Sequence, residues 1–217
     1  MLLPVTLIVV AYLIGSIPFS YLVARILAGK DVRNEGSRNV GATNVARTAG
    51  RLAGVLALFL DLLKGWAVIV FARWIVSRPE WPFPAGTMAW ESREMWIALA
   101  GLIAVLGHMF PLWLRFHGGK GVATAAGVVL SLDPRVFLAS LIVFAIVVLV
   151  SRMVSLGSIL TAASIPVLFR FIAHEAPFWR TILSIGIALA VILKHHSNIA
   201  RLVGGSERKL GRGKEDE

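Results

Sequence analysis

From Asn34 to Arg47 the chain reads Asn-Glu-Gly-Ser-Arg-Asn-Val-Gly-Ala-Thr-Asn-Val-Ala-Arg, and a long apolar run lies on each side, Leu2–Leu27 and Leu52–Val76. Each run exceeds the roughly 20 apolar residues that a helix needs to cross a bilayer. The residues between the runs include glycines, which let the backbone approach a ligand closely, and side chains that donate hydrogen bonds to anions. This first polar segment, Asn34–Arg47, therefore predicts an anion-binding connection between two membrane spans.

The composition of the whole chain is typical of a membrane protein. Of its 217 residues, 57% are hydrophobic and 16% are charged, whereas soluble domains carry roughly a quarter charged residues. We expect an all-α integral membrane protein with a single domain over residues 1–210 and a solvated C-terminal tail over residues 211–217. Because the chain has no cysteine, disulfides and thiol chemistry are excluded.

Further apolar runs predict the remaining membrane helices. They are Met95–Trp113, Val136–Val150, Val154–Phe171 and Thr181–Leu193, together with a shorter run at Val122–Leu132. Within the first run, Gly15-Ser16-Ile17-Pro18 predicts a kink, because proline interrupts helical hydrogen bonding. Residues 77–95 form a connection rich in proline and tryptophan, Pro79, Trp81, Pro82, Pro84 and Trp90, which we expect at a membrane interface.

The short run Val122–Leu132 decides the predicted topology. If it is a crossing, the protein has seven transmembrane helices, and the polar segments Asn34–Arg47, Arg115–Gly121 and Lys194–Lys209 share one side with the C-terminus. That side then carries most of the lysines and arginines, so the positive-inside rule makes it cytoplasmic and the N-terminus external. We therefore expect seven transmembrane helices, one of them short.

The formal net charge of +10 has two interpretations. Basic residues that flank apolar runs suit membrane orientation and attraction to anionic lipids or substrates. Nucleic-acid binding would instead need basic residues interleaved with aromatic ones on a soluble face. We therefore expect the phospholipid bilayer and an anionic ligand as partners, and no nucleic acid. The sequence indicates no particular protein partner.

The second polar segment, Arg115–Gly121, ends in the glycine loop Gly118-Gly119-Lys120-Gly121, directly before an apolar run. Such a loop can bind an anion through its backbone amides, the lysine and the positive end of the following helix. It is not a Walker A loop, because Gly121 stands where serine or threonine is needed. On this motif alone, a flexible and positively charged turn is the favoured alternative.

Asp61 and Lys64 lie three residues apart in an apolar run, on one face of a helix. Charged groups inside a membrane are costly and usually pair with each other or serve a function. The pattern predicts an ion pair. We favour a structural pair that fixes helix packing over one that supports a site.

His195 and Asn198 have the same spacing at the end of the last apolar run. A histidine there can act as a general base, bind a hydroxyl group or simply stabilise the C-terminal end of a helix. His196 and His108 compete for any such role. Because the chain has no cysteine and no His-Glu-x-x-His spacing, we expect no metal, and nothing in the sequence indicates a cofactor.

Three motifs occur together and in order: Gly36-Ser37-Arg38-Asn39-Val40-Gly41-Ala42-Thr43-Asn44, Gly118-Gly119-Lys120-Gly121-Val122-Ala123-Thr124, and His195-His196-Ser197-Asn198-Ile199-Ala200-Arg201-Leu202 followed by Gly205-Ser206-Glu207. They resemble the three signature motifs of the bacterial acyl-phosphate:glycerol-3-phosphate acyltransferases, the PlsY family. The stretches Gly15–Pro18 and Asp61-Leu62-Leu63-Lys64-Gly65 are also similar to that family. The resemblance covers nearly the whole chain.

The resemblance implies a multi-pass enzyme of the bacterial inner membrane whose active site faces the cytoplasm. Its reaction would transfer a fatty acyl group from acyl phosphate to the 1-hydroxyl of glycerol 3-phosphate, giving lysophosphatidic acid and phosphate for phospholipid biosynthesis. The implied catalytic residues are Ser37, Arg47, Lys120, His195 and Asn198. The implied substrate-binding residues are Asn39, Gly41, Thr43, Asn44, Gly118, Gly119, Gly121 and Glu207.

By the same resemblance, Ser37, Arg47 and Lys120 would hold phosphate, while His195 and Asn198 would contact the glycerol hydroxyls. Glu207 would brace the loops. The general base is left open between His195 and a phosphate oxygen of the substrate. The chain departs from the family at Arg38, where glycine is common, and at His117, where lysine is frequent.

Two other classes of protein compete with an enzyme. A membrane transporter for a phosphorylated small solute would also suit broken helices and basic residues near the membrane. Against it, the sequence has no convincing internal repeat, and its polar groups gather on one predicted face. A lipid-binding scaffold is the third class, and it would not depend on Lys120.

Overall fold

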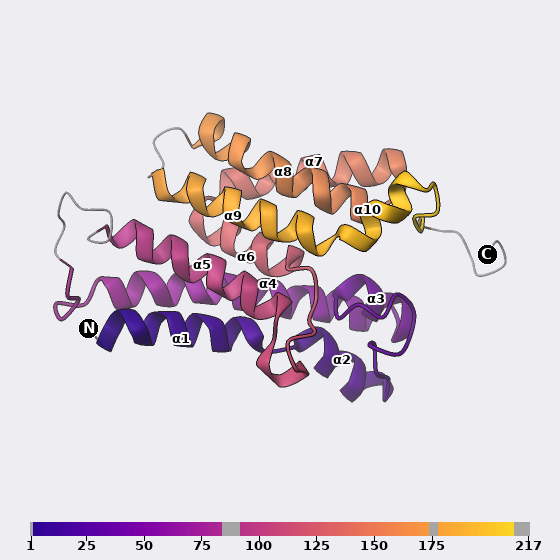
Figure 1. Ribbon diagram of the computed structural model, residues 1–217, viewed down its shortest axis with the longest axis horizontal. Helices are drawn as coiled ribbons and strands as arrows, with labels where there is room; N and C mark the ends of the chain where they lie inside the picture. The colour runs from indigo at the N-terminus through magenta and orange to yellow at the C-terminus, as the bar shows by residue number, and fades with distance from the viewer. Residues whose placement is uncertain (1, 84–91, 174–177, 211–217) are drawn as a thin grey trace. The chain divides into compact units, whose positions relative to one another are not determined.

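The structure is a computed structural model that describes residues 2–83, 92–173 and 178–210. All the regular secondary structure in these ranges is helical, which confirms the all-α prediction (Figure 1). Contacts divide the chain into two compact units, Met1–Leu132 and Asp133–Glu217, and each is described by itself. The single domain over residues 1–210 stays a prediction. The predicted tail, and Pro84 and Trp90 of the predicted interfacial connection, lie outside the described residues.

The first unit is a bundle around one long helix. Its helices are α1 (Leu2–Ser16), α2 (Phe19–Ala28), α3 (Ala42–Thr48), α4 (Arg51–Val76), α5 (Arg93–Met109) and α6 (Val122–Leu132), and a 3-10 turn covers Leu112–Leu114. Helix α4 contacts each of the other five helices, and its contacts with α6, α3 and α5 are the most extensive. Helices α1 and α5 also run side by side (Figure 1).

The predicted kink in the first apolar run is a complete break between two helices. Helix α1 ends at Ser16 and α2 begins at Phe19, so Ile17 and Pro18 belong to neither helix. Proline has no backbone N–H and cannot continue the hydrogen bonding of α1. The break leaves a backbone carbonyl group, that of Ile17, within reach of a side chain from α4.

Helices α4 and α6 cross at glycines. A methyl group at Gly65 of α4 would overlap the carbonyl oxygen of Thr124, and one at Gly127 of α6 would overlap that of Leu62. Small residues allow helix backbones to approach closely, which is the usual basis of helix packing where lipid removes the hydrophobic driving force. The short helix α6 is therefore held against α4 by direct backbone contact.

The second unit consists of α7 (Pro134–Ser151), α8 (Val154–Ile172), α9 (Phe178–Lys194) and α10 (His196–Val203). Helix α8 contacts both α7 and α9. Asp133 caps α7, because its carboxylate accepts the backbone N–H of Arg135 at 2.9 Å and Pro134 follows at the first helical position. Helices α9 and α10 meet at His195 with a bend of 62°.

Five helices or helix pairs in the described ranges are long and apolar enough to cross a membrane, and six if the bent pair α9–α10 counts as one span. Helix α6 is apolar but has only 11 residues. Each predicted apolar run is helical, the first as two helices, α1 and α2. Helices α3 and α10 were not predicted, because they lie in segments interpreted as polar connections. Such short helices depend on packing more than on helix propensity. Val45 is buried in α3, and Asn198 is buried in α10.

The α4–α6 contact can be tested with Gly127→Leu. The added side chain must displace the α4 backbone, and we expect a loss of about 1–3 kcal/mol in the free energy of unfolding, as for overpacked cores. Thermal unfolding of the purified protein in detergent measures this loss. The control is Gly204→Ala, where the added methyl group makes only an ordinary contact. Equal stability of Gly127→Leu and the unaltered protein would contradict the packing.

Candidate active site

Asn44 organises the first polar segment from inside. Its side chain is 1% exposed, and its Oδ1 accepts the backbone N–H of Ser37 at 2.8 Å. Its Nδ2 donates to the carbonyl oxygens of Val32 at 2.9 Å and Glu35 at 3.1 Å. The amide thus joins helix α3 to the turn that precedes it. Any contact of Asn44 with a substrate stays a prediction, and its observed bonds shape the loop.

Arg38 adopts a backbone conformation that favours glycine. Its φ angle is +57°, in the left-handed region, which costs a residue with a side chain roughly 1–2 kcal/mol. By the resemblance, the family usually has a small residue, commonly glycine, at this position. The chain therefore keeps the loop conformation that glycine allows, although the residue itself differs.

The exposed groups of this segment include two arginines, Arg38 and Arg47, and two hydroxyl groups. Ser37, Thr43 and Arg47 are exposed, with Arg47 in the last turn of α3, while Asn39 and Gly41 are half-buried. The side chain of Thr48 donates to the carbonyl oxygen of Asn44 at 2.9 Å and closes that turn. Ser37 and Arg47 are therefore exposed on a segment whose backbone Asn44 holds in place.

The glycine loop is attached to the end of helix α5. The backbone N–H of Gly118 donates to the carbonyl oxygen of Met109, and that of Gly119 to His108, each at 3.2 Å. These two amides fix the shape of the loop, so the predicted binding of an anion by Gly118 and Gly119 stays a prediction. Gly121 has a φ angle of +81° and leads directly into α6. Lys120 lies between Gly119 and Gly121 and is half-buried.

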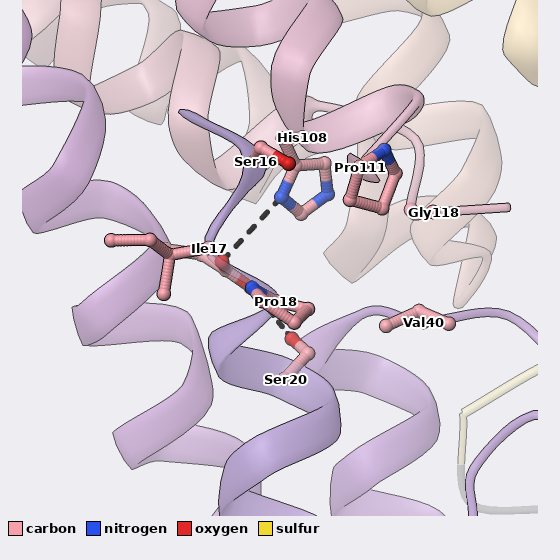
Figure 2. A pocket seen from close by; sticks show the side chains of 10 residues that line it. Ser16, Ile17, Pro18, Ser20, Val40, His108, Pro111 and Gly118 are labelled. Atoms are coloured by element: carbon pink, nitrogen blue, oxygen red, sulfur yellow. Dashed lines mark hydrogen bonds and ion pairs between the residues drawn. The ribbon is translucent and has the colours of Figure 1, made fainter. Parts of the chain in front are cut away.

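The structure brings the first polar segment and the glycine loop together. Val40, Gly118 and Gly119 line one small cavity of about 10 Å³ (Figure 2), close to the room that one water molecule needs. A methyl group at Gly119 would overlap the carbonyl oxygen of Val40. Two motifs that are far apart in the sequence thus meet within the first unit.

His195 lies at the bend of the second unit and is 2% exposed. Its Nδ1 is 2.8 Å from the carbonyl oxygen of Val191. Because a carbonyl oxygen only accepts hydrogen bonds, Nδ1 carries the hydrogen, and in the neutral ring Nε2 is the acceptor. This tautomer suits a group that accepts a hydrogen bond or a proton from a hydroxyl.

Glu207 gathers three donors around one carboxylate in the second unit. Its Oε1 accepts Ser155 Oγ and Asn198 Nδ2, each at 2.7 Å, and its Oε2 accepts Arg201 Nε at 2.8 Å. Burial raises the pKa of the Glu207 carboxyl, but these hydrogen bonds and the Arg201 charge outweigh it, so the pKa lies below its ordinary value. The bond to Glu207 also fixes which way the Asn198 amide points.

The sequence did not predict that further polar residues of the first unit surround the Asp61–Lys64 pair. The predicted Asp61–Lys64 ion pair is confirmed, with 2.7 Å between Oδ1 and Nζ. Ser20 and His108 join it, and both line the cavity beside the glycine loop. No local pattern predicts this cluster, because its members come from three helices. The described residues contain no group of three or more histidine, aspartate or glutamate side chains placed to hold a metal.

The fold and these polar segments define a class: a multi-pass helical membrane protein with glycine-rich, basic segments. Residues 5–205 match the family described as Glycerol-3-phosphate acyltransferase. The glycerol-3-phosphate acyltransferase of Acaryochloris marina is 43% identical over 212 residues, which cover 96% of this chain and 92% of the relative. That of Trichlorobacter lovleyi is 46% identical over 200 residues, covering 92% and 94%. The chain belongs to the glycerol-3-phosphate acyltransferase family.

Solved structures agree with this assignment. A crystal structure of PlsY, described as an integral membrane glycerol 3-phosphate acyltransferase in its glycerol 3-phosphate form, has a TM-score of 0.81 at 40% identity and covers 96% of each chain. A second form of PlsY, with lysophosphatidic acid, has a TM-score of 0.78 at 39% identity and covers 96% of this chain and 95% of its own. The resemblance drawn from the three motifs is confirmed.

The conformation of Arg38 predicts a stabilising substitution. Arg38→Gly removes the left-handed strain, partly offset by the greater freedom of glycine in the unfolded chain, and should raise the free energy of unfolding by about 1 kcal/mol. The matched control is Arg38→Ala, which removes the same charge but keeps a Cβ atom. Thermal unfolding of both variants in detergent decides the matter. A glycine variant no more stable than the alanine variant would contradict the backbone conformation.

The hydrogen bonds of Glu207 predict a pH dependence of stability. A lowered pKa means that the carboxylate stabilises the folded state above its ordinary pKa of 4.5, and that this contribution is lost as the pH falls through the lower folded-state pKa. Glu207→Gln should be less stable than the unaltered protein at neutral pH, and the gap should narrow in acid. Thermal unfolding over that pH range measures it, with the exposed Glu80→Gln as control. A difference in stability that stays constant with pH would contradict the lowered pKa of Glu207.

Proposed function

We propose that this protein transfers a fatty acyl group from an acyl phosphate to the 1-hydroxyl of glycerol 3-phosphate, giving lysophosphatidic acid and inorganic phosphate. The observation that carries the proposal is the match to PlsY in its glycerol 3-phosphate form over 96% of both chains. The acyl donor and the hydroxyl position rest on the motif resemblance. The reaction supplies the lysophospholipid from which phospholipids are built.

The proposed chemistry needs no covalent enzyme intermediate. The hydroxyl oxygen of glycerol 3-phosphate attacks the acyl carbonyl carbon, the bond from that carbon to the phosphate oxygen breaks, and phosphate leaves. Because the acyl phosphate is already activated, the protein has two main tasks. It must hold two anionic substrates close together, and it must offset their mutual repulsion.

Ser37, Arg47 and Lys120 are proposed to bind phosphate. Arg47 can present two parallel donors to phosphate oxygens, Lys120 supplies a point charge, and Ser37 adds a neutral hydroxyl donor. The exposure of Ser37 and Arg47 on a loop that Asn44 braces supports this role. Asn39, Gly41, Thr43 and Gly121 are proposed to complete the binding surface, with Asn44, Gly118 and Gly119 acting mainly through the shape of the loops.

His195 and Asn198 are proposed to bind the glycerol hydroxyls. The hydrogen bond from His195 Nδ1 to Val191 leaves Nε2 as the acceptor in the neutral ring, which suits contact with a hydroxyl that must lose its proton. The proton then goes either to Nε2 or to a phosphate oxygen of the substrate. Glu207 orients Asn198 through its bond to Nδ2 and is proposed to brace this part of the site.

We also propose the membrane arrangement and one functional domain over residues 1–210. Counting α6 as a short crossing gives seven transmembrane helices, with the N-terminus external and the site facing the cytoplasm of a bacterial inner membrane. The distribution of lysine and arginine supports this orientation. The short length of α6 is accommodated by its backbone contact with α4 and does not require it to face lipid alone.

The proposal is tested with purified protein in lipid vesicles, given palmitoyl phosphate with and without glycerol 3-phosphate. Phosphate release and lysophosphatidic acid formation should need both substrates. Arg47→Ala and Lys120→Ala should each lower turnover at least about a hundredfold, as removal of a charge-stabilising donor does. Arg78→Ala is the matched control, because this exposed arginine stacks on Trp74 and has no proposed role.

Near-normal turnover in both the Arg47 and the Lys120 variants would refute the phosphate assignment. Absence of turnover in folded, unaltered protein would refute the reaction itself. In that case, uptake of labelled glycerol 3-phosphate into vesicles without any acyl donor would distinguish a transporter.

A further inference from the structure

A cluster of charged and polar groups lies buried in the first unit. Asp61 and Lys64 of α4 are 1% and 3% exposed, and His108 of α5 is 7% exposed. The Asp61 carboxylate lies 2.7 Å from Lys64 Nζ, accepts the hydroxyl of Ser20 at 2.6 Å, and lies 3.4 Å from His108 Nδ1. Figure 2 shows Ser20 and His108 on two sides of the cavity where this cluster lies.

Helix packing alone does not explain why charged residues are buried here. Removing two charges from water costs free energy that their attraction often fails to recover, and apolar residues of similar volume commonly hold helices together at least as well. Ionisable residues inside a membrane span are for this reason most often associated with function. The question is which functional part of the protein the cluster contacts.

The cluster is connected to the break between α1 and α2 on one side. Lys64 Nζ donates to the carbonyl oxygen of Ile17 at 2.7 Å. Ser16, the last residue of α1, accepts the backbone N–H of Leu112 at 2.7 Å through its Oγ. These bonds tie the broken helix to the chain that leaves α5 and leads to the glycine loop.

On the other side, His108 reaches the glycine loop itself. Its carbonyl oxygen accepts the N–H of Gly119, and its ring lies so close to Gly119 that an added methyl group would overlap Nε2. The same methyl group would overlap the carbonyl oxygen of Val40, in the first polar segment. The His108 ring therefore lies between the buried carboxylate and the place where the two phosphate-binding segments meet.

We propose that Asp61, Lys64 and His108 are positioning residues that hold the glycine loop, and with it Lys120, in the geometry that binds the phosphate of the acceptor. The proposal rests on the proposed function. His108 transmits the position of the Asp61 carboxylate to Gly119 and acts through the loop, without contact with the substrate. Because a hydrogen bond weakens steeply once its distance or angle departs from the preferred range, a small shift of this loop is enough to weaken binding.

The test compares KM for glycerol 3-phosphate with kcat in three variants. His108→Phe keeps an aromatic ring but removes both ring nitrogens, while Asp61 keeps Lys64 and Ser20 as partners. His108→Asn keeps a polar atom near the position of Nδ1. Asp61→Leu combined with Lys64→Met removes the ion pair as a whole, so that no single charge is left buried.

We expect His108→Phe and the double variant to raise KM for glycerol 3-phosphate at least about tenfold, with a smaller effect on kcat and none on KM for palmitoyl phosphate. His108→Asn should recover part of the loss. The matched control is Val68→Ala, at a fully buried position of α4 that is not part of the cluster. It should lower the melting temperature but leave KM unchanged.

An unchanged KM in the His108 variants, or an equal rise in KM for Val68→Ala, would overturn the proposal, because loss of affinity would then be unrelated to the cluster or a consequence of lower stability. If the double variant does not fold, the two His108 variants decide. Unaltered protein without acyl transfer would refute the proposed function, whereas active unaltered protein with unaffected variants would refute this inference alone.

Discussion

Polar groups that enter an apolar span must find partners within the protein, since no water is present there to bind them. The ion pair of Asp61 and Lys64 meets this requirement at the centre of the first unit, where its partners also include Ser20 and the carbonyl group of Ile17. The break between α1 and α2 is tolerated because these bonds satisfy its backbone. At the same break, Ser16 Oγ accepts the backbone N–H of Leu112, in the chain that leads from α5 to the glycine loop.

Within each unit, some polar residues shape the loops, and other residues are proposed to bind a ligand. Asn44 and Glu207 each bind several loop or helix groups at once. Arg47 and Ser37 are exposed, and they lie in the segment whose backbone Asn44 holds in place. This division agrees with the proposed reaction, in which the donor is already activated, because catalysis then depends on the placement of charges more than on a strong nucleophile.

Much of the helical architecture could be predicted from local sequence. The long apolar runs are helical, and the first is divided at Ile17 and Pro18, because proline cannot continue the hydrogen bonding of α1. Helices α3 and α10 were missed because their stability comes from a buried face and not from their own apolar length. The contacts of His108 with Asp61 and Gly119 were missed for another reason, since they join segments that are separate in the sequence.

By itself, the sequence determined the class of protein, the main helices and the three motifs that identify the family. These follow from local properties: apolar length, proline, glycine, and the order of short patterns along the chain. Only the tertiary structure decided that Asn44 and the first two glycines of the loop hold backbone in place, and that a buried carboxylate is connected to the glycine loop through His108. The physical reason is that hydrogen bonds between distant segments, such as Ser20 to Asp61 and Leu112 to Ser16, form only once the helices pack.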